Sequence, residues 1–74
     1  MKYALISCIN GNFAVKSEHG TKKAGIIAFN QMSASLWNAD DVITARLNLV
    51  DDDLFVVDGK YTEVIDRSAE SEEE

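Results

Sequence analysis

An Asn-Gly pair near the start of the chain separates a mainly apolar run from a segment in which apolar and polar residues alternate. Residues 2–9 and 12–18 flank Asn10-Gly11, a dipeptide that supplies the two positive φ angles of a type I′ turn. The pattern predicts a β-hairpin with a two-residue loop. Pairing across this loop places the following side chains on one face, which we take as the core face: Ala4, Ile6, Cys8, Phe13 and Val15. The opposite face is then expected to carry Tyr3, Leu5 and Ile9.

Between residues 21 and 37 the apolar period changes to that of an α-helix. At about 100° per residue, one stripe collects small and apolar side chains. Its members are Gly25, Ile26, Phe29, Met32, Ser33 and Leu36. Gly20 or Thr21 suits the N-cap of this helix. Ile27 and Ala34 fall off the stripe, so both side chains are expected to face solvent in a monomer.

The remaining chain alternates as β-strands do. The apolar side of its first run is formed by Ile43, Ala45, Leu47 and Leu49. This run predicts a strand with one buried face. The three aspartates at 51–53 predict a turn, and residues 54–57 and 61–66 are expected as two strands around Asp58-Gly59. Residues 67–74 offer little to bury and are expected to form a flexible acidic tail.

Together these elements predict an α+β domain over residues 1–66, in the order ββαβββ, with a single helix packed on a mainly antiparallel sheet. In this order of elements, residues 2–66 resemble ubiquitin and the small bacterial immunoglobulin-binding domains. The resemblance implies a β-grasp topology, in which the first strand lies parallel to a late one. It concerns architecture alone, because no functional motif is shared, and it implies no function.

Composition limits the chain to one small domain. It has 74 residues, of which 46% are hydrophobic and 27% charged, and this length leaves no room for a second independent core. No apolar run approaches the roughly 20 residues that cross a bilayer, and the N-terminal apolar stretch is too short for a secretory signal. We therefore expect a cytoplasmic protein that does not enter a membrane. The single cysteine, Cys8, cannot close an intrachain disulfide, so stability depends on packing or on a partner.

Charge divides the chain into two unequal halves. Residues 1–39 hold four lysines and one glutamate, a net charge of +3, whereas residues 40–74 hold three basic and twelve acidic residues, a net charge of −9. Binding to nucleic acid depends mainly on Lys and Arg side chains that neutralise phosphates, so direct nucleic-acid binding is not expected. The acidic half permits another hypothesis, a polyanion mimic that blocks the basic groove of a nucleic-acid-binding protein.

The candidate catalytic and metal-binding residues do not converge. Cys8 and His19 are the natural pair for nucleophilic catalysis or for zinc, but the predicted hairpin places them toward opposite ends. The aspartates at 51–53 lack the ligand spacing of a calcium loop. We therefore expect no metal, no cofactor and no enzymatic activity.

Two kinds of binding surface are indicated instead. The N-terminus of the predicted helix brings together a glycine, a hydroxyl and two cations, where free N–H groups attract anions. These anion-binding candidates are Gly20, Thr21, Lys22 and Lys23. Apolar side chains that one helix cannot cover form the second surface. These protein-contact candidates are Tyr3, Leu5, Ile9, Ile27 and Ala34.

The leading hypothesis is a non-enzymatic protein-binding or regulatory module, with a homodimer among its forms and an inhibitor from a phage or mobile element as one concrete example. The first alternative is an anion- or nucleotide-binding domain that uses the N-terminus of its helix, and the second is the polyanion mimic. The pattern also leaves one structural alternative open. A one-residue register shift would exchange the two faces of the first strand.

Overall fold

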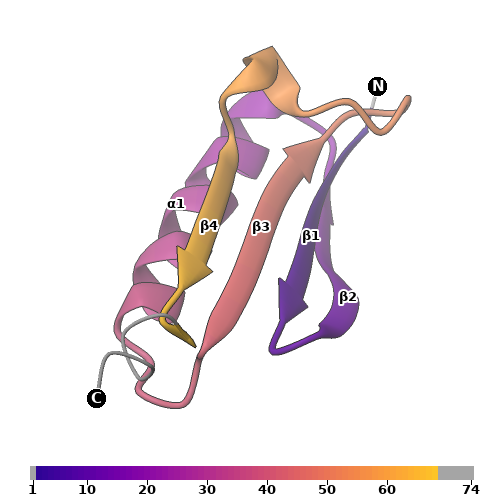
Figure 1. The fold of residues 1–74 in the computed structure, drawn as a ribbon. Helices are drawn as coiled ribbons and strands as arrows, with labels where there is room; N and C mark the ends of the chain where they lie inside the picture. The colour runs from indigo at the N-terminus through magenta and orange to yellow at the C-terminus, as the bar shows by residue number, and fades with distance from the viewer. Residues whose placement is uncertain (1, 69–74) are drawn as a thin grey trace.

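The computed structural model describes residues 2–68 and shows one helix packed against one face of a four-stranded sheet (Figure 1). The elements in chain order are β1 (Tyr3–Ile9), β2 (Asn12–His19), α1 (Lys22–Trp37), β3 (Thr44–Val50), the short 3₁₀ helix η1 (Val57–Gly59) and β4 (Thr62–Asp66). The α+β class, with a single helix on an antiparallel sheet, is therefore confirmed. The order observed over the described residues is ββαββ, one strand fewer than predicted.

The first hairpin forms as predicted. Asn10 and Gly11 have φ angles of 51° and 86°, which fit a type I′ turn, and the strands pair in the predicted register next to it. Farther from the turn the register shifts, and Lys16 has no counterpart on β1. Lys16 is therefore the extra residue of a β-bulge, which twists β2 where it forms one edge of the sheet.

The sheet order is β2-β1-β3-β4, and every neighbouring pair is antiparallel. α1 has 16 residues, about 24 Å of helix, so it returns the chain to the end of the sheet where β1 finishes. There the amide of Asn10 donates a hydrogen bond of 2.7 Å to the carbonyl oxygen of Thr44, the first residue of β3. β3 therefore runs antiparallel to β1, and the parallel strand pair of the β-grasp topology is wrong for the described residues.

The structure reverses the two faces predicted for β1. Leu5 is only 2% exposed and belongs to the core under α1, and Tyr3 and Ile9 pack against that core. Phe13 and Val15, which were predicted to be buried, are 69% and 53% exposed. The prediction is wrong because β1 carries apolar residues on both faces, so its period alone cannot choose the buried one.

The register between β1 and β3 makes that choice. The buried apolar row of β3 consists of Ala45, Leu47 and Leu49, as predicted. These residues pair in turn with Ile9, Ser7 and Leu5 of β1. Paired residues share one face of a sheet, so these three side chains of β1 must face α1 as well. Ser7 is thereby buried, and its hydroxyl has no hydrogen-bond partner among the described residues.

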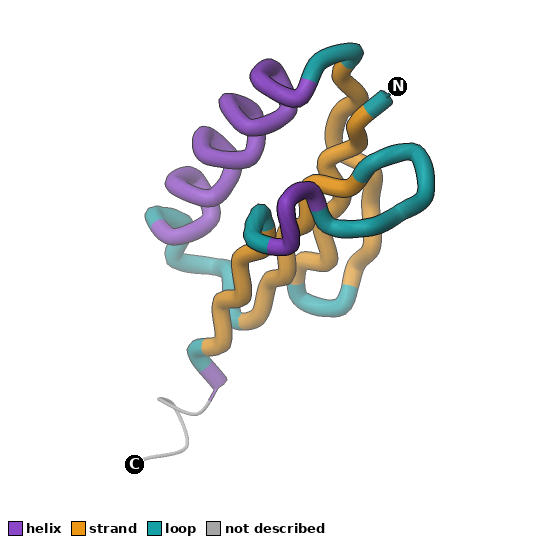
Figure 2. The backbone as a smooth tube through the Cα atoms, turned by 90° about the horizontal axis from the view of Figure 1, so that it is seen from above, coloured by secondary structure: helices purple, strands orange, loops and turns teal. Residues whose placement is uncertain are grey.

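α1 lies along one side of the strands (Figure 2) and presents the predicted stripe to them. Its fully buried residues are Gly25, Phe29 and Leu36. Ile27 is 48% exposed and Ala34 also faces solvent, as expected. The helix approaches the sheet closely at Gly25, because a Cβ added there would lie 2.9 Å from Cδ1 of Leu49.

Two predictions for the second half of the chain are wrong. Ile43 is 48% exposed rather than buried, because β3 begins one residue later and Val42 enters the core instead. No strand forms at residues 54–57: residues 54–56 form a loop with one isolated bridge to β3, and Val57 begins η1. The backbone leaves the extended conformation at Leu54, whose φ is 67°.

Arg67, which the sequence placed in a flexible tail, is held to the domain. Its guanidinium donates hydrogen bonds to the carbonyl oxygens of Trp37 (2.7 Å), Ala39 (2.7 Å) and Val42 (3.1 Å). These carbonyls belong to the end of α1 and to the loop before β3, where helix geometry leaves acceptors without partners. Arg67 therefore connects the end of β4 to the end of α1 and to the loop before β3. Residues 69–74 of the expected tail lie outside the described residues.

Candidate protein-binding face

α1 covers one face of the sheet, and the opposite face is turned toward the viewer in Figure 1. The strand registers arrange the side chains of this second face in cross-strand rows. From β2 to β4, one row contains Phe13, Cys8, Arg46 and Val64, and the next contains Val15, Ile6, Asn48 and Thr62. We call these eight residues the open face.

Apolar side chains dominate the β2 end of the open face. Phe13 and Val15 are 69% and 53% exposed, and Val64 at the β4 end is 55% exposed. Ile6 and Cys8 are half-buried between them. Soluble proteins commonly expose apolar residues singly, whereas a continuous exposed group is typical of an interaction site.

Arg46 is the cation at the centre of the open face. It lies between Cys8 on β1 and Val64 on β4, and its guanidinium makes no hydrogen bond or ion pair within residues 2–68. Asp66, two residues beyond Val64, instead accepts hydrogen bonds from the hydroxyl and the amide of Ser68, and these bonds lower the pKa of the Asp66 carboxyl. The guanidinium of Arg46 is therefore available to a carboxylate or carbonyl of another molecule.

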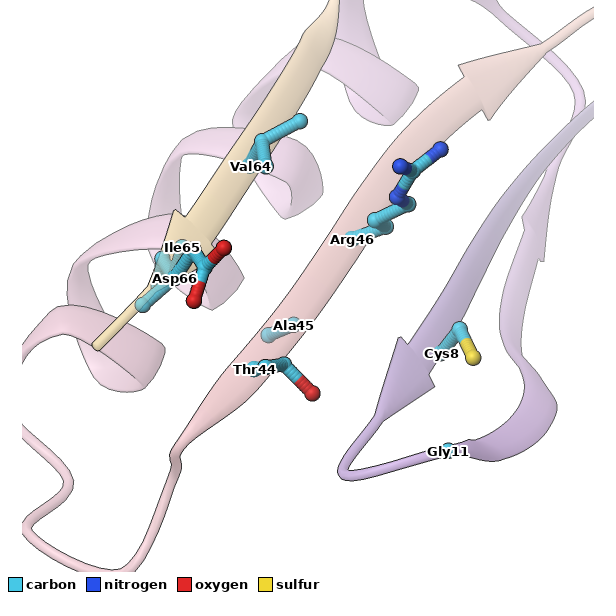
Figure 3. Close-up of a pocket in the computed structure, with 8 residues that line it drawn as sticks. All are labelled: Cys8, Gly11, Thr44, Ala45, Arg46, Val64, Ile65 and Asp66. Atoms are coloured by element: carbon cyan, nitrogen blue, oxygen red, sulfur yellow. The ribbon is translucent and has the colours of Figure 1, made fainter. Parts of the chain in front are cut away.

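A shallow hollow of about 210 Å³ lies on this side of the sheet (Figure 3). Its lining residues are Cys8, Gly11, Thr44, Ala45, Arg46, Val64, Ile65 and Asp66. Figure 3 shows Cys8, Arg46 and Val64 on three different strands around it. Small-molecule sites usually measure about 300–1,000 Å³. The hollow therefore suits a single side chain of a protein better than a metabolite.

Three of the five predicted contact residues lie on the side of β1 that α1 covers. The buried candidates are Tyr3, Leu5 and Ile9, which contribute to the core. The exposed candidates are Ile27 and Ala34, on the outer side of α1. Phe13 and Val15 were missed because their alternation was interpreted as a core row. The one-sided apolar pattern of β3, combined with its register to β1, is the feature that could have identified them.

Two of the four residues of the predicted anion site, Thr21 and Lys22, have partners within the chain. Thr21 is the N-cap of α1, and its hydroxyl accepts a hydrogen bond of 3.2 Å from the amide three residues later. Nζ of Lys22 lies 2.8 Å from Oδ2 of Asp58, and the hydrogen bond with Asp58 raises the pKa of Lys22. Gly20 and Lys23 are exposed. The helix start is a capped terminus with an ion-paired lysine.

Cys8 and His19 lie far apart, as the predicted hairpin requires. His19 pairs with Tyr3 at the start of β1, and Cys8 is five residues farther along that strand, about 17 Å away. Nε2 of His19 lies 2.7 Å from the hydroxyl oxygen of Ser17. Within residues 2–68, no group of three or more His, Cys, Asp or Glu side chains is arranged to hold a metal ion.

Comparison with known proteins identifies no relative. No family model, curated protein or solved structure matches the chain. In the described part of the chain, no helix has both the length and the apolar character needed to span a membrane. Function is therefore inferred from the open face.

Proposed function

We propose that the chain is a protein-binding module that contacts another protein through the open face. The observation that carries this proposal is the placement of Phe13, Val15 and Val64, each more than half exposed, on one side of the sheet. Removing apolar surface from water is favourable by about 25 cal/mol per Å². A partner can cover these side chains without any change in the fold.

The side chains of the open face indicate which groups a partner would present. An apolar surface is required opposite Phe13 and Val15, at the β2 end. Arg46 requires an acceptor, and a carboxylate gives the stronger, charge-assisted hydrogen bond. Aromatic and Arg side chains are also the commonest anchors of protein interfaces. We infer a partner protein that presents an apolar patch beside an acidic side chain.

The proposed function is recognition without catalysis. The thiol of Cys8 has Phe13 and Arg46 as its neighbours in register, and neither of these is a general base. The hollow beside Cys8, at about 210 Å³, is also small for a substrate. Both observations favour an interface over an active site.

Photo-cross-linking tests the proposal. A photoreactive phenylalanine analogue at position 13 of the tagged full chain, expressed in its native cells, is expected to capture one dominant protein. The same analogue at position 27, on the outer side of α1, is the matched control. Adding Arg46→Ala and Val64→Ser should reduce capture at position 13 about tenfold or more, because both side chains are exposed and belong to the open face.

Three outcomes would contradict the proposal. Equal capture at positions 13 and 27 would show that the open face has no preference for a partner. A product that is unaffected by the two substitutions would show that Arg46 and Val64 do not contribute. A cross-link to a second copy of the chain would assign the face to a homodimer and reject a different protein as its partner.

A further inference from the structure

The loop between β3 and β4 presents two adjacent bulky apolar side chains to solvent. Leu54 is 73% exposed and Phe55 is 69% exposed. Leu54 has a φ of 67°, in the left-handed region that is unfavourable for a residue with a branched side chain. Strained residues and exposed apolar pairs both concentrate at interaction sites. We call Leu54 and Phe55 the knob.

Hydrogen bonds hold the knob in a defined loop. Oδ1 of Asp51 accepts bonds from the amides of Asp53 (2.9 Å) and Phe55 (3.1 Å). The amide of Asp51 donates a bond of 3.0 Å to the carbonyl oxygen of Phe55. The amide of Lys2 donates to the carboxylate of Asp52 at 2.9 Å and ties the loop to the start of β1. Figure 2 shows the loop extending clear of the strands. The hydrogen bonds fix the shape of this loop, and three aspartates at 51–53 precede the knob.

A second hollow, of about 430 Å³, lies between α1 and β2. Its lining residues are Leu5, Lys16, Ser17, Ala28, Gln31, Met32 and Ser35. Leu5, Ala28 and Met32 give it an apolar part. Lys16 is exposed beside it and forms no ion pair within residues 2–68. We call this site the α1–β2 hollow, and it combines apolar side chains with an available cation.

We propose that the knob of one copy of this chain inserts into the α1–β2 hollow of a second copy. The hollow is open rather than enclosed, so two side chains of another protein can reach it, and its apolar side chains suit Leu54 and Phe55. Lys16 complements the acids at 51–53 beside the knob. The same acids oppose insertion into an anionic membrane surface, so a protein hollow with a basic rim is the better match.

This contact is heterologous, because the knob and the α1–β2 hollow are different surfaces of each copy. The knob cannot fill the hollow of its own chain. Its loop is tied to Lys2 at one end of the sheet, whereas the hollow lies beside the middle of α1. When two copies associate, one keeps a free knob and the other keeps a free hollow. Further copies can therefore add until an open chain or a closed ring has formed. The contact uses no residue of the open face and can fail independently of the proposed function.

Sedimentation velocity of the full chain, from micromolar to millimolar concentration, tests the proposal. The weight-average mass should rise past that of a dimer and should fall when salt is added. The knob variant carries Leu54→Asn and Phe55→Ser. The hollow variant carries Ser35→Trp, which fills the hollow from an exposed position of α1. Each variant alone should weaken self-association about tenfold or more.

A mixture of the two variants gives the decisive result. The knob variant keeps its hollow and the hollow variant keeps its knob, so together they should form a 1:1 dimer that does not grow. Phe13→Ser, on the open face, should assemble like the unmodified chain. Circular dichroism checks that each variant folds, and Lys16→Glu serves as a second hollow variant. A monomer at millimolar concentration, a mixture that stays monomeric, or an assembly abolished by Phe13→Ser would overturn the proposal.

Discussion

Replacing Arg67 with alanine should sharply lower the free energy of unfolding. Its guanidinium donates three hydrogen bonds, of which the bond to Trp37 is exposed and the bonds to Ala39 and Val42 are partly buried. A hydrogen bond from a charged donor contributes about 1.5–3 kcal/mol when it is shielded from water. The two partly buried bonds dominate, because water can replace the exposed one. Both of these bonds come from the same nitrogen and are only partly buried, so each contributes less than the shielded value. We expect Arg67→Ala to destabilise the domain by about 2–4 kcal/mol.

The effect is large for a domain of this size, whose core yields about 3–5 kcal/mol. Urea unfolding measures it, with the fluorescence of Trp37 as a local probe, since the guanidinium lies 5.7 Å from the indole ring. Arg46→Ala is the matched control, because it removes the same charge from a side chain that makes no hydrogen bond or ion pair within residues 2–68. Its effect should stay within about 0.5 kcal/mol.

A third variant separates charge from geometry. Arg67→Lys keeps the positive charge but replaces the planar fork with a single ammonium, so it should recover less than half of the lost stability. A loss below about 1 kcal/mol for Arg67→Ala, or equal losses at positions 46 and 67, would refute the structural role assigned to these bonds.

Three further predictions follow from single residues. Ser7→Ala should raise the free energy of unfolding by about 1 kcal/mol, because it removes a buried hydroxyl that has no partner among the described residues; a urea midpoint that falls would count against this. Leu54→Gly should stabilise the domain by about 0.5–1 kcal/mol. It relieves a left-handed backbone that costs about 1–2 kcal/mol, and this gain is partly offset because glycine raises the entropy of the unfolded chain. Leu54→Ala keeps the strain and should give no such gain in thermal unfolding. Ser68→Ala should raise the pKa of Asp66 toward its ordinary value of 3.8, as followed by NMR titration. Because the folded pKa of Asp66 is lowered, its contribution to stability is present above the unfolded pKa and is lost as pH falls through the folded value; the variant should lose less stability over that acid range than the unmodified chain.

The sequence predicts the elements whose causes are local. Asn10-Gly11 carries the angles of its own turn, and Thr21 caps the helix that follows it. The positive φ of Leu54 could not be predicted in this way, because no neighbouring residue in the sequence requires it. The hydrogen bonds around Asp51 shape the loop and replace the expected strand. Arg67 was also beyond prediction, since its partners lie about 25–30 residues earlier in the chain and its neighbours in the sequence are typical of a tail.

The buried face of β1 could not be identified from the pattern of β1 alone. β1 has an apolar row on each side, so its own pattern is consistent with either face being buried. Its pairing with β3 removes the ambiguity, because Ser7 lies opposite the buried Leu47 and must share its face. Phe13 then follows, since it pairs with Cys8 on the other side. An exposed apolar row on an edge strand has the same period as a core row, and only the long-range register distinguishes them.

The central position of β1 also shapes how fast the domain folds. On one side β1 pairs with β2 of the same hairpin. On the other side it pairs with β3, which starts 35 residues after β1 ends. Closing a connection of this length slows the search for the native pairing. Glycine and serine residues inserted beside Asp40 should therefore slow refolding in stopped-flow measurements and leave the unfolding rate almost unchanged. If unfolding accelerates instead, the β1–β3 pairing forms after the kinetic barrier, and the early hairpin with its helix is the nucleus.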